Sequence, residues 1–332
     1  MNCRLPRPLV SVVVCTYNQA GTITRAIDSV LAQDHRPIEI VVVDNGSTDA
    51  TAAALRLYEG HPEVHVIRHD ANEAVTVRLN HAIARTHGPF VSLLYGDDSY
   101  TPDKLSTQVA AFEALDDSYG VVYTPGRRHR DSTGEEWEAA SLQASGNILV
   151  ELLDASQRGC FINPISPLVR RACFDQHPFH EDLFVEGEAH YLRIAITHRF
   201  QFLSRSTVIM HEHEHNIGKA IRANGVGIVV LLDRLMSDAR LATEERQAVR
   251  RARARLHRNL GWQSLRVLED GRWARTQFGK AIRVRPSTAL QPKVIVGGAL
   301  SLLPAAALRR VNRVGYRLHA GREHFSVVDG YR

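Results

Sequence analysis

The chain has 332 residues, of which 44 % are hydrophobic and 23 % are charged, and it carries a net charge of +5. This is an ordinary globular composition, and the length predicts two structural units. No stretch approaches the roughly 18 consecutive apolar residues of a membrane-spanning helix, and the residues before the first predicted strand are too few for a signal peptide. We therefore expect a cytoplasmic protein.

The positions of the arginines and cysteines narrow this expectation. Arginines concentrate between Arg234 and Arg322, so the excess positive charge belongs mainly to the C-terminal part of the chain. A basic surface of this kind suits an anionic membrane, a phosphate-rich substrate or a nucleic acid. The four cysteines include no Cys-x-x-Cys pair, so we interpret them as reduced thiols rather than zinc ligands.

The first hundred residues alternate between short apolar runs and segments with helical periodicity. Strands are predicted at residues 9–15, 38–43, 64–67 and 89–94, and helices at residues 22–32, 49–58 and 73–86. Such alternation is typical of βαβ units. The predicted fold class is therefore α/β, with a mostly parallel, Rossmann-like nucleotide-binding sheet flanked by helices and followed by an α-helical C-terminal region.

The later part of the chain is less regular and then becomes helical. We predict strands at residues 121–123 and 200–209, helices at 147–155 and 186–197, and a polar loop at 127–137. Helices follow at 228–239, 243–268 and 273–284. The predicted organisation is a nucleotide-binding domain at residues 8–220, a helical hairpin region at 221–286 and an apolar and basic tail at 287–332.

The tail is apolar over residues 294–308 and then carries Arg309, Arg310, Arg313 and Arg317. An apolar segment too short to span a bilayer, followed by arginines, is typical of docking at an anionic membrane surface. The alternative is that the segment packs on the protein's own core. With docking, the protein would be peripheral on the inner face of the membrane.

Polar clusters follow three of the predicted strands. They are Thr16-Tyr17-Asn18, Asp44-Asn45-Gly46 and Gly96-Asp97-Asp98. Ligands bind beyond the carboxyl ends of the strands in open α/β sheets, so we expect the three clusters to converge at one edge.

These residue types suit the parts of a nucleotide. The carboxylates of Asp97 and Asp98 suit Mg²⁺ or Mn²⁺, which would neutralise a departing diphosphate, although a solvated turn is the alternative. Asp44 would accept hydrogen bonds from a base or ribose, unless it caps the next helix. Tyr17 would stack on a base or simply pack. Arg78 would reach the diphosphate or lie on an exposed helix face.

The segment from His211 to Asn216, HEHEHN, is unusually rich in histidine. In an extended backbone, His211, His213 and His215 lie on one face, with the two glutamates on the other. Three imidazoles would suit a transition metal. A single histidine with Asn216 would instead serve a diphosphate, and a solvated loop is the third interpretation.

The order of these motifs resembles bacterial family 2 glycosyltransferases of the GT-A fold. The resemblance rests first on SVVVCTYNQAGTITRAIDSVLAQ at residues 11–33 and IEIVVVDNGSTDAT at residues 38–51. Further matches in order and spacing are Asn72, Asn80, Gly88, LLYGDDSYTPDKL at 93–105, VEGEAHYLRIA at 185–195 and HEHN at 213–216. The two N-terminal motifs together are far more specific than a lone glycine pattern.

The resemblance implies an activity and a role for each motif. A sugar would move, with inversion, from a UDP- or dTDP-type donor to a hydroxyl of a glycan or lipid-linked acceptor, as in surface-polysaccharide assembly. The base and ribose would be held by Thr16, Tyr17, Asn18 and Asp44, with Asn45 and Arg78 as further candidates for nucleotide binding. Asp97 and Asp98 would hold the metal and diphosphate, and His213 would contact either. A carboxylate would act as the general base.

Three positions depart from the family pattern. Tyr95 replaces the first Asp of the Asp-x-Asp motif, and Ala74 replaces a glycine. Gly187 stands where the base Asp is expected, so Glu188, one residue later, or Glu186, one residue earlier, would have to supply the carboxylate.

Other functions remain to be weighed against this one. A degenerate domain that binds a nucleotide sugar without efficient turnover would account for Tyr95 and Gly187. A metal hydrolase would use the histidine row. We expect no nucleic-acid binding, because the arginine-rich helices lack interleaved aromatic residues and no recognised module is present.

Overall fold

The computed structural model describes residues 7–155, 162–183, 186–212 and 221–319. The chain divides into two compact units. The first is made of residues 1–152 and 160–215, and the second of residues 153–159 and 216–332.

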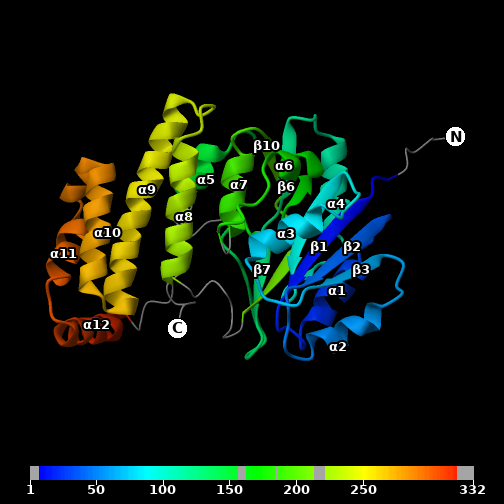
Figure 1. Cartoon of the computed structure of the whole chain (residues 1–332). Helices are drawn as coiled ribbons and strands as arrows, with labels where there is room; N and C mark the ends of the chain where they lie inside the picture. Colours follow the sequence, from blue (N-terminus) through cyan, green and yellow to red (C-terminus); the bar gives the residue numbers. More distant parts are fainter. Residues whose placement is uncertain (1–6, 156–161, 184–185, 213–220, 320–332) are drawn as a thin grey trace. The chain divides into compact units, whose positions relative to one another are not determined.

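The first unit is built around a seven-stranded sheet in the order β10-β6-β9-β4-β1-β2-β3 (Figure 1). Its strands are β1 (Val10–Thr16), β2 (Ile38–Asp44), β3 (Val64–Arg68), β4 (Phe90–Tyr95), β6 (Tyr119–Tyr123), β9 (Leu168–Arg170) and β10 (Arg199–Phe202). Neighbouring strands are parallel except at β9, which is antiparallel to β4 and β6. The predicted mostly parallel α/β sheet is confirmed.

Helices cover the sheet, which explains the unbroken apolar runs of the central strands. β1 and β2 are buried along their whole length, as expected for parallel strands with both faces covered. On one face, α1 (Ile23–Leu31) and α4 (Lys104–Glu113) pack in a cluster with alternate residues of β1 and β2. α3 (Val75–Ile83) contacts the same two strands with Leu79 and Ala82 buried, and α2 (Thr51–Leu55) continues as the 3₁₀ helix η1 (Arg56–Tyr58).

A second, four-stranded sheet corrects two predictions. It joins β5 (Ser99–Tyr100), β11 (Val208–Glu212), β7 (Gly126–Arg130) and β8 (Glu135–Glu138) in the order β5-β11-β7-β8. The predicted loop at residues 127–137 is therefore wrong, because it contains the hairpin β7–β8. The predicted strand at 200–209 is two strands, β10 and β11, which belong to different sheets.

Cross-strand charge explains why the hairpin forms without an apolar pattern. The register places Arg127 opposite Glu138 and Arg130 opposite Glu135, and the second pair forms an ion pair of 2.6 Å. Facing opposite charges stabilise an antiparallel pair, whereas strand prediction from the sequence relies on apolar alternation.

Short helices complete the first unit. They are α5 (Leu149–Ala155), which extends into the second unit, α6 (Arg171–Gln176), the 3₁₀ helix η3 (Gly187–Ala189) and α7 (His190–Ile194). The single helix predicted at 186–197 is thus a 3₁₀ turn followed by a short α-helix.

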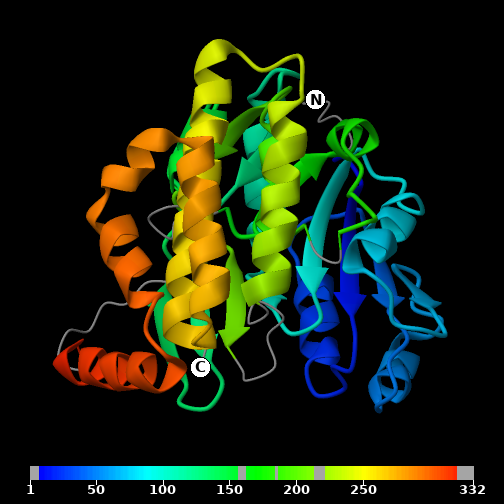
Figure 2. The same ribbon diagram turned by 60° about the vertical axis from the view of Figure 1, so that its left-hand side comes forward.

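The second unit is helical, as predicted. It contains α8 (Ile221–Met236), α9 (Thr243–Gln263), the π-helix η5 (Ser264–Leu268), α10 (Gly271–Val284), the 3₁₀ helix η6 (Pro286–Leu290), α11 (Pro292–Leu300) and α12 (Ala305–His319). Helices α8, α9 and α10 lie side by side (Figures 1 and 2). Asp270 caps α10 by accepting the N–H of Trp273 at 2.9 Å.

The apolar tail segment is divided between core and surface. Val294 and Leu308 are buried against Phe278 of α10 in a small core, so the segment packs partly on the protein itself. Ile295 and Leu302 are 58 % and 72 % exposed. Of the helices in the described ranges, none combines the length and apolar character needed to cross a membrane.

Candidate active site

The carboxyl ends of β1, β2 and β4 meet at one edge of the sheet. The strand register pairs Thr16 with Asp44 and Cys15 with Tyr95. The fold therefore brings together the three polar clusters that follow these strands. Cys15 lies beneath this edge, and burial raises the pKa of its thiol to about 12, so it stays protonated.

Hydrogen bonds between two loops shape the first part of this edge. Asn18 adopts a left-handed conformation (φ 53°), accepts the N–H of Thr48 at 2.8 Å and donates its own N–H to Ser47 Oγ at 2.9 Å. Tyr17, directly before Asn18 in the sequence, is 40 % exposed. Its ring is accessible to a flat ligand.

Asp44 ends β2 with a buried carboxylate. One oxygen, Oδ1, accepts the N–H of Ser47 at 2.9 Å, and Oδ2 lies 3.7 Å from Nε of the exposed Arg68. At the start of the following helix, it is Asp49 rather than Asp44 that accepts a backbone N–H, from Thr51 at 2.9 Å. Asp44 is therefore not the cap of that helix.

Asn45 and Arg78 form a buried support for the neighbouring loop. Arg78 Nε donates to Asn45 Oδ1 at 2.8 Å and Nη2 donates to the Ala71 carbonyl at 2.9 Å. Asn45 Nδ2 donates to Asn72 Oδ1 at 2.8 Å and to the Glu73 carbonyl at 2.9 Å. Arg78 is buried, so its placement on an exposed helix face was wrong.

Gly46 allows the same loop to approach closely. Its φ is +76°, and a Cβ atom there would lie 2.5 Å from the backbone carbon of Ala71. Such a φ favours glycine because other side chains crowd the backbone. The Asp44-Asn45-Gly46 cluster thus combines one acidic side chain with two residues that hold the loop at 71–73.

Asp97 and Asp98 fit a hard divalent cation. Asp98 is buried and its Oδ1 accepts the backbone N–H of His211 at 2.9 Å. Burial and the negative charge of Asp97 raise the pKa of Asp98 well above its usual range, against the smaller opposing effects of that hydrogen bond and of Arg25 and Arg128. A cation would relieve this repulsion, and carboxylate oxygens are the donors that Mg²⁺ and Mn²⁺ prefer.

The second sheet adds side chains that the sequence analysis did not single out. His129 and Asp131 of the β7–β8 hairpin lie beside His211, and the three could together hold a metal ion. Arg25 donates to the Asp97 carbonyl at 2.7 Å. The charges repeated across residues 127–130 and 135–138, around Thr133-Gly134, were the signal that would have revealed the hairpin.

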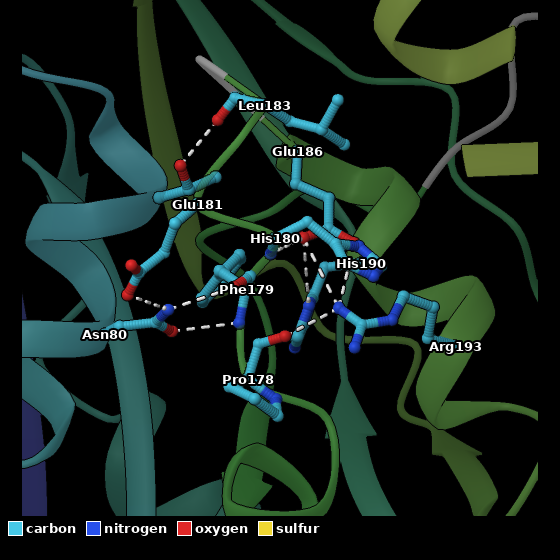
Figure 3. A network of polar contacts seen from close by, with 10 residues as sticks. Asn80, Pro178, Phe179, His180, Glu181, Leu183, Glu186, His190 and Arg193 are labelled. Carbon is cyan, nitrogen blue, oxygen red and sulfur yellow. Dashed lines mark hydrogen bonds and ion pairs between the residues drawn. The ribbon is translucent and has the colours of Figure 1, made fainter. Parts of the chain in front are cut away.

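Glu186 lies in a closed polar network (Figure 3). Its carboxylate accepts the N–H of His180 at 2.9 Å and an Arg193 Nη1 hydrogen bond at 3.2 Å, and it lies 3.8 Å from Nδ1 of His190. Burial alone would raise the pKa of Glu186, but His190, the His180 N–H and Arg193 overcome it and lower the pKa to about 2.

The same network joins α3 to the loop that precedes Glu186. Asn80 Oδ1 accepts the N–H of Phe179 at 2.9 Å, and Asn80 Nδ2 donates to the Phe179 carbonyl at 2.9 Å (Figure 3). Asn80, part of the motif found in the sequence, therefore positions the segment that carries Glu186. The Glu188 side chain, and His213 to Asn216, lie outside the described residues.

The chain resembles known glycosyltransferases in sequence. Residues 11–169 match the family model described as Glycosyl transferase family 2. The succinoglycan biosynthesis protein ExoU of Rhizobium meliloti (strain 1021) is 32 % identical over 180 residues, covering 51 % of this chain and 50 % of ExoU. The chain spans half or less of the length of the first curated relatives it matches.

Solved structures resemble the chain over nearly its whole length. S. aureus TarS 1-349 in complex with UDP-GlcNAc gives a TM-score of 0.64 at 18 % identity, covering 97 % of this chain and 95 % of that one. Mannosyltransferase PcManGT from Pyrobaculum calidifontis in complex with GDP-Man and Mn²⁺ gives 0.57 at 18 % identity, covering 96 % and 89 %. At this identity the likeness establishes the fold. It follows that residues 11–169 form a glycosyltransferase family 2 region and that the chain has the GT-A fold.

Proposed function

We propose that the chain is an inverting glycosyltransferase that moves a sugar from a UDP- or dTDP-type donor to a hydroxyl of a glycan or lipid-linked acceptor. The observation that carries the proposal is the sheet edge at which Thr16 and Asp44 lie beside the strand that leads to Asp97 and Asp98. UDP-GlcNAc bound to TarS supports the donor class. The name of ExoU, a succinoglycan biosynthesis protein, supports a role in polysaccharide assembly.

Each part of the edge has a distinct task in this proposal. Asp44 accepts hydrogen bonds from the base or ribose, and Tyr17 offers its exposed ring to the base. Asp97 and Asp98 hold Mg²⁺ or Mn²⁺, which, when bound, neutralises charge on the leaving diphosphate. We assign Asn45 and Arg78 a supporting role, because their polar atoms already hold the loop at 71–73.

We assign the general base to Glu188 rather than to Glu186. A carboxylate with a pKa of about 2 is a weak base, and the Glu186 carboxylate is enclosed by its partners. Glu188 follows Gly187 within η3. The acceptor hydroxyl oxygen attacks the anomeric carbon while Glu188 takes its proton, and the bond to the diphosphate breaks with its electron pair leaving on the nucleotide.

Nucleotide binding tests the donor site. We expect one of UDP, dTDP, GDP or CDP to raise the melting temperature in the presence of Mn²⁺, because a ligand of the folded state stabilises it by mass action. Asp97→Asn should remove the metal-dependent part of the shift. If no nucleotide stabilises the wild-type protein, with or without Mn²⁺, the donor site is refuted.

Turnover separates an enzyme from a domain that binds a nucleotide sugar without efficient transfer. We expect donor hydrolysis or transfer by the wild type, and at least a hundredfold loss in Glu188→Gln with nucleotide binding retained. Gly187→Asp returns a carboxylate to the expected base position, where φ is +52° and a Cβ would meet no other atom within 4 Å. Turnover gained only in that variant would favour the binding domain.

We also propose that the second unit docks on anionic lipid at the inner, cytoplasmic face of a membrane. Leu290, Ile295 and Leu302 are exposed, and Lys293, Arg309 and Arg310 lie near them in sequence. Truncation before Val294 would remove part of the small core around Phe278, so point variants are the better test. Ile295→Asp and Leu302→Asp should reduce sedimentation with anionic vesicles. Leu57→Asp, at a residue of the first unit that is 76 % exposed, should not. Unchanged sedimentation in both tail variants would refute docking by this surface.

A further inference from the structure

Three metal-ligating side chains lie together on the second sheet. β7 and β11 are parallel, and their register pairs His129 with His211, whose ring centroids are 5.0 Å apart. Asp131 follows β7, and its Oδ1 lies 2.8 Å from His211 Nδ1 and 3.7 Å from His129 Nε2. One ligand atom from each residue lies within 4.8 Å of the other two.

The outer nitrogen of each imidazole also has an acceptor. His129 Nδ1 lies 3.2 Å from Glu136 Oε1, and His211 Nε2 lies 3.4 Å from Ser99 Oγ. Metal-bound histidines commonly donate their other N–H to an oxygen of this kind, which fixes the ring and the tautomer. The 2.8 Å contact is a hydrogen bond in which His211 Nδ1 donates to Asp131 Oδ1. A metal ion would take the place of that proton, and with a proton on each outer nitrogen the two inner nitrogens would present lone pairs to the ion.

We propose that His129, Asp131 and His211 bind a transition-metal ion of the Zn²⁺ class. Two imidazoles and one carboxylate suit such an ion, whereas the oxygen-only pair Asp97 and Asp98 suits Mg²⁺ or Mn²⁺. Bonds of about 2.0–2.2 Å place neighbouring ligand atoms roughly 3–3.5 Å apart, so the cluster needs to contract by only about 1 Å. The ligand set leaves a coordination position for water or another oxygen.

Binding at this position would connect the hairpin to the candidate diphosphate site. The backbone N–H of His211 donates to Asp98 Oδ1 at 2.9 Å, so an ion that fixes His211 also fixes the position of that N–H. Arg25 approaches Asp131 from α1, with its Nη1 4.0 Å from Oδ1, while its Nη2 donates to the Asp97 carbonyl. The Arg25 guanidinium therefore does not enclose the Asp131 carboxylate.

Metal titration of the full chain, stripped with a chelator and free of nucleotide, tests the proposal. We expect about one equivalent of Zn²⁺ to bind and raise the melting temperature, and Co²⁺ to give the visible absorption of a nitrogen-ligated ion. His129→Ala and His211→Ala should each weaken Zn²⁺ binding at least tenfold. Because His211 is buried, the partly exposed His129, replaced by Gln, provides the variant least prone to misfold, with circular dichroism as the check.

Two control variants test whether Zn²⁺ binds specifically to the His129, Asp131 and His211 cluster. His65→Ala, on the exposed side of β3, should leave Zn²⁺ affinity unchanged. Asp97→Asn should keep Zn²⁺ binding, because the two sites differ. Wild-type affinity in the folded His129 variants, no stoichiometric Zn²⁺ in the wild type, or loss of Zn²⁺ in Asp97→Asn would each refute a separate site. The readout needs no nucleotide, so it stands or falls independently of donor binding.

Discussion

Glu186→Gln should destabilise the first unit in a pH-dependent way. The Glu186 carboxylate has no solvent-exposed surface and contacts His180, His190 and Arg193. Its pKa falls from 4.5 to about 2 on folding, because those partners outweigh the cost of burial. At about 1.4 kcal/mol per pKa unit, the charged form contributes about 3 kcal/mol to the free energy of unfolding, as an upper value.

The sign of the pH dependence follows from the lowered pKa. A carboxyl whose folded pKa is depressed stabilises the fold fully above its unfolded pKa, here 4.5, and loses that contribution as the pH falls towards 2. Glutamine keeps the shape of the side chain but not its charge. The difference between wild type and Glu186→Gln should therefore be about 3 kcal/mol at pH 7 and should shrink steadily below pH 4.5.

Urea unfolding at several pH values measures this difference. Trp137 is the only tryptophan before residue 216, so a background with Trp262→Phe and Trp273→Phe makes fluorescence report on the first unit. Glu113→Gln, an exposed carboxylate on α4, is the matched control and should shift the midpoint little. Equal stability of Glu186→Gln and wild type at pH 7, or a difference that stays constant down to pH 3, would refute the reasoning.

Three further predictions concern the candidate donor edge. Gly46→Ala should cost about 3 kcal/mol, because a positive φ is combined with a clash against Ala71, whereas Gly60→Ala, with φ +83° and open space, should cost about 1 kcal/mol in the same urea assay. Asp98→Asn should keep or raise the metal-free melting temperature by removing a like charge beside Asp97, yet abolish Mn²⁺-dependent nucleotide stabilisation in thermal shift; a wild-type nucleotide response would contradict it. Arg78→Met should cost about 2–3 kcal/mol, since Asn45 Oδ1 and the Ala71 carbonyl lose a buried charged donor, and an unchanged urea midpoint would count against that support.

The edge of the sheet was predictable because it depends on local signals. The short, largely apolar runs before Thr16, Asp44 and Tyr95 are buried on both faces, and a parallel sheet with helices on both sides accommodates several such runs. Once the strands are parallel, their carboxyl ends coincide. The convergence of the three polar clusters therefore follows without knowledge of any long-range contact.

Other parts of the site depend on contacts between residues far apart in the sequence. Arg78 resembles an exposed helix residue in isolation, and it is buried because Asn45, 33 positions earlier, offers it an acceptor. The hairpin of β7 and β8 is held by paired charges. It pairs with β11 through residues that lie 82 positions apart in the sequence, such as His129 and His211. The repeated charges of residues 127–130 and 135–138 could have revealed the hairpin, but no pattern within either segment encodes its pairing with β11.

The turn from Glu186 to Glu188 shows why a family motif does not transfer residue by residue. Glu186 is held by His180 before it and by Arg193 on α7 after it, which fixes where the turn begins. Gly187 then takes a φ of +52°, a conformation that glycine adopts without the steric cost paid by other residues. Because the first carboxylate is committed to the fold and the second position carries no side chain, Glu188 is the residue to which we assign the base. Loss of the expected aspartate is therefore compatible with catalysis, provided that the base has moved one residue along the 3₁₀ helix.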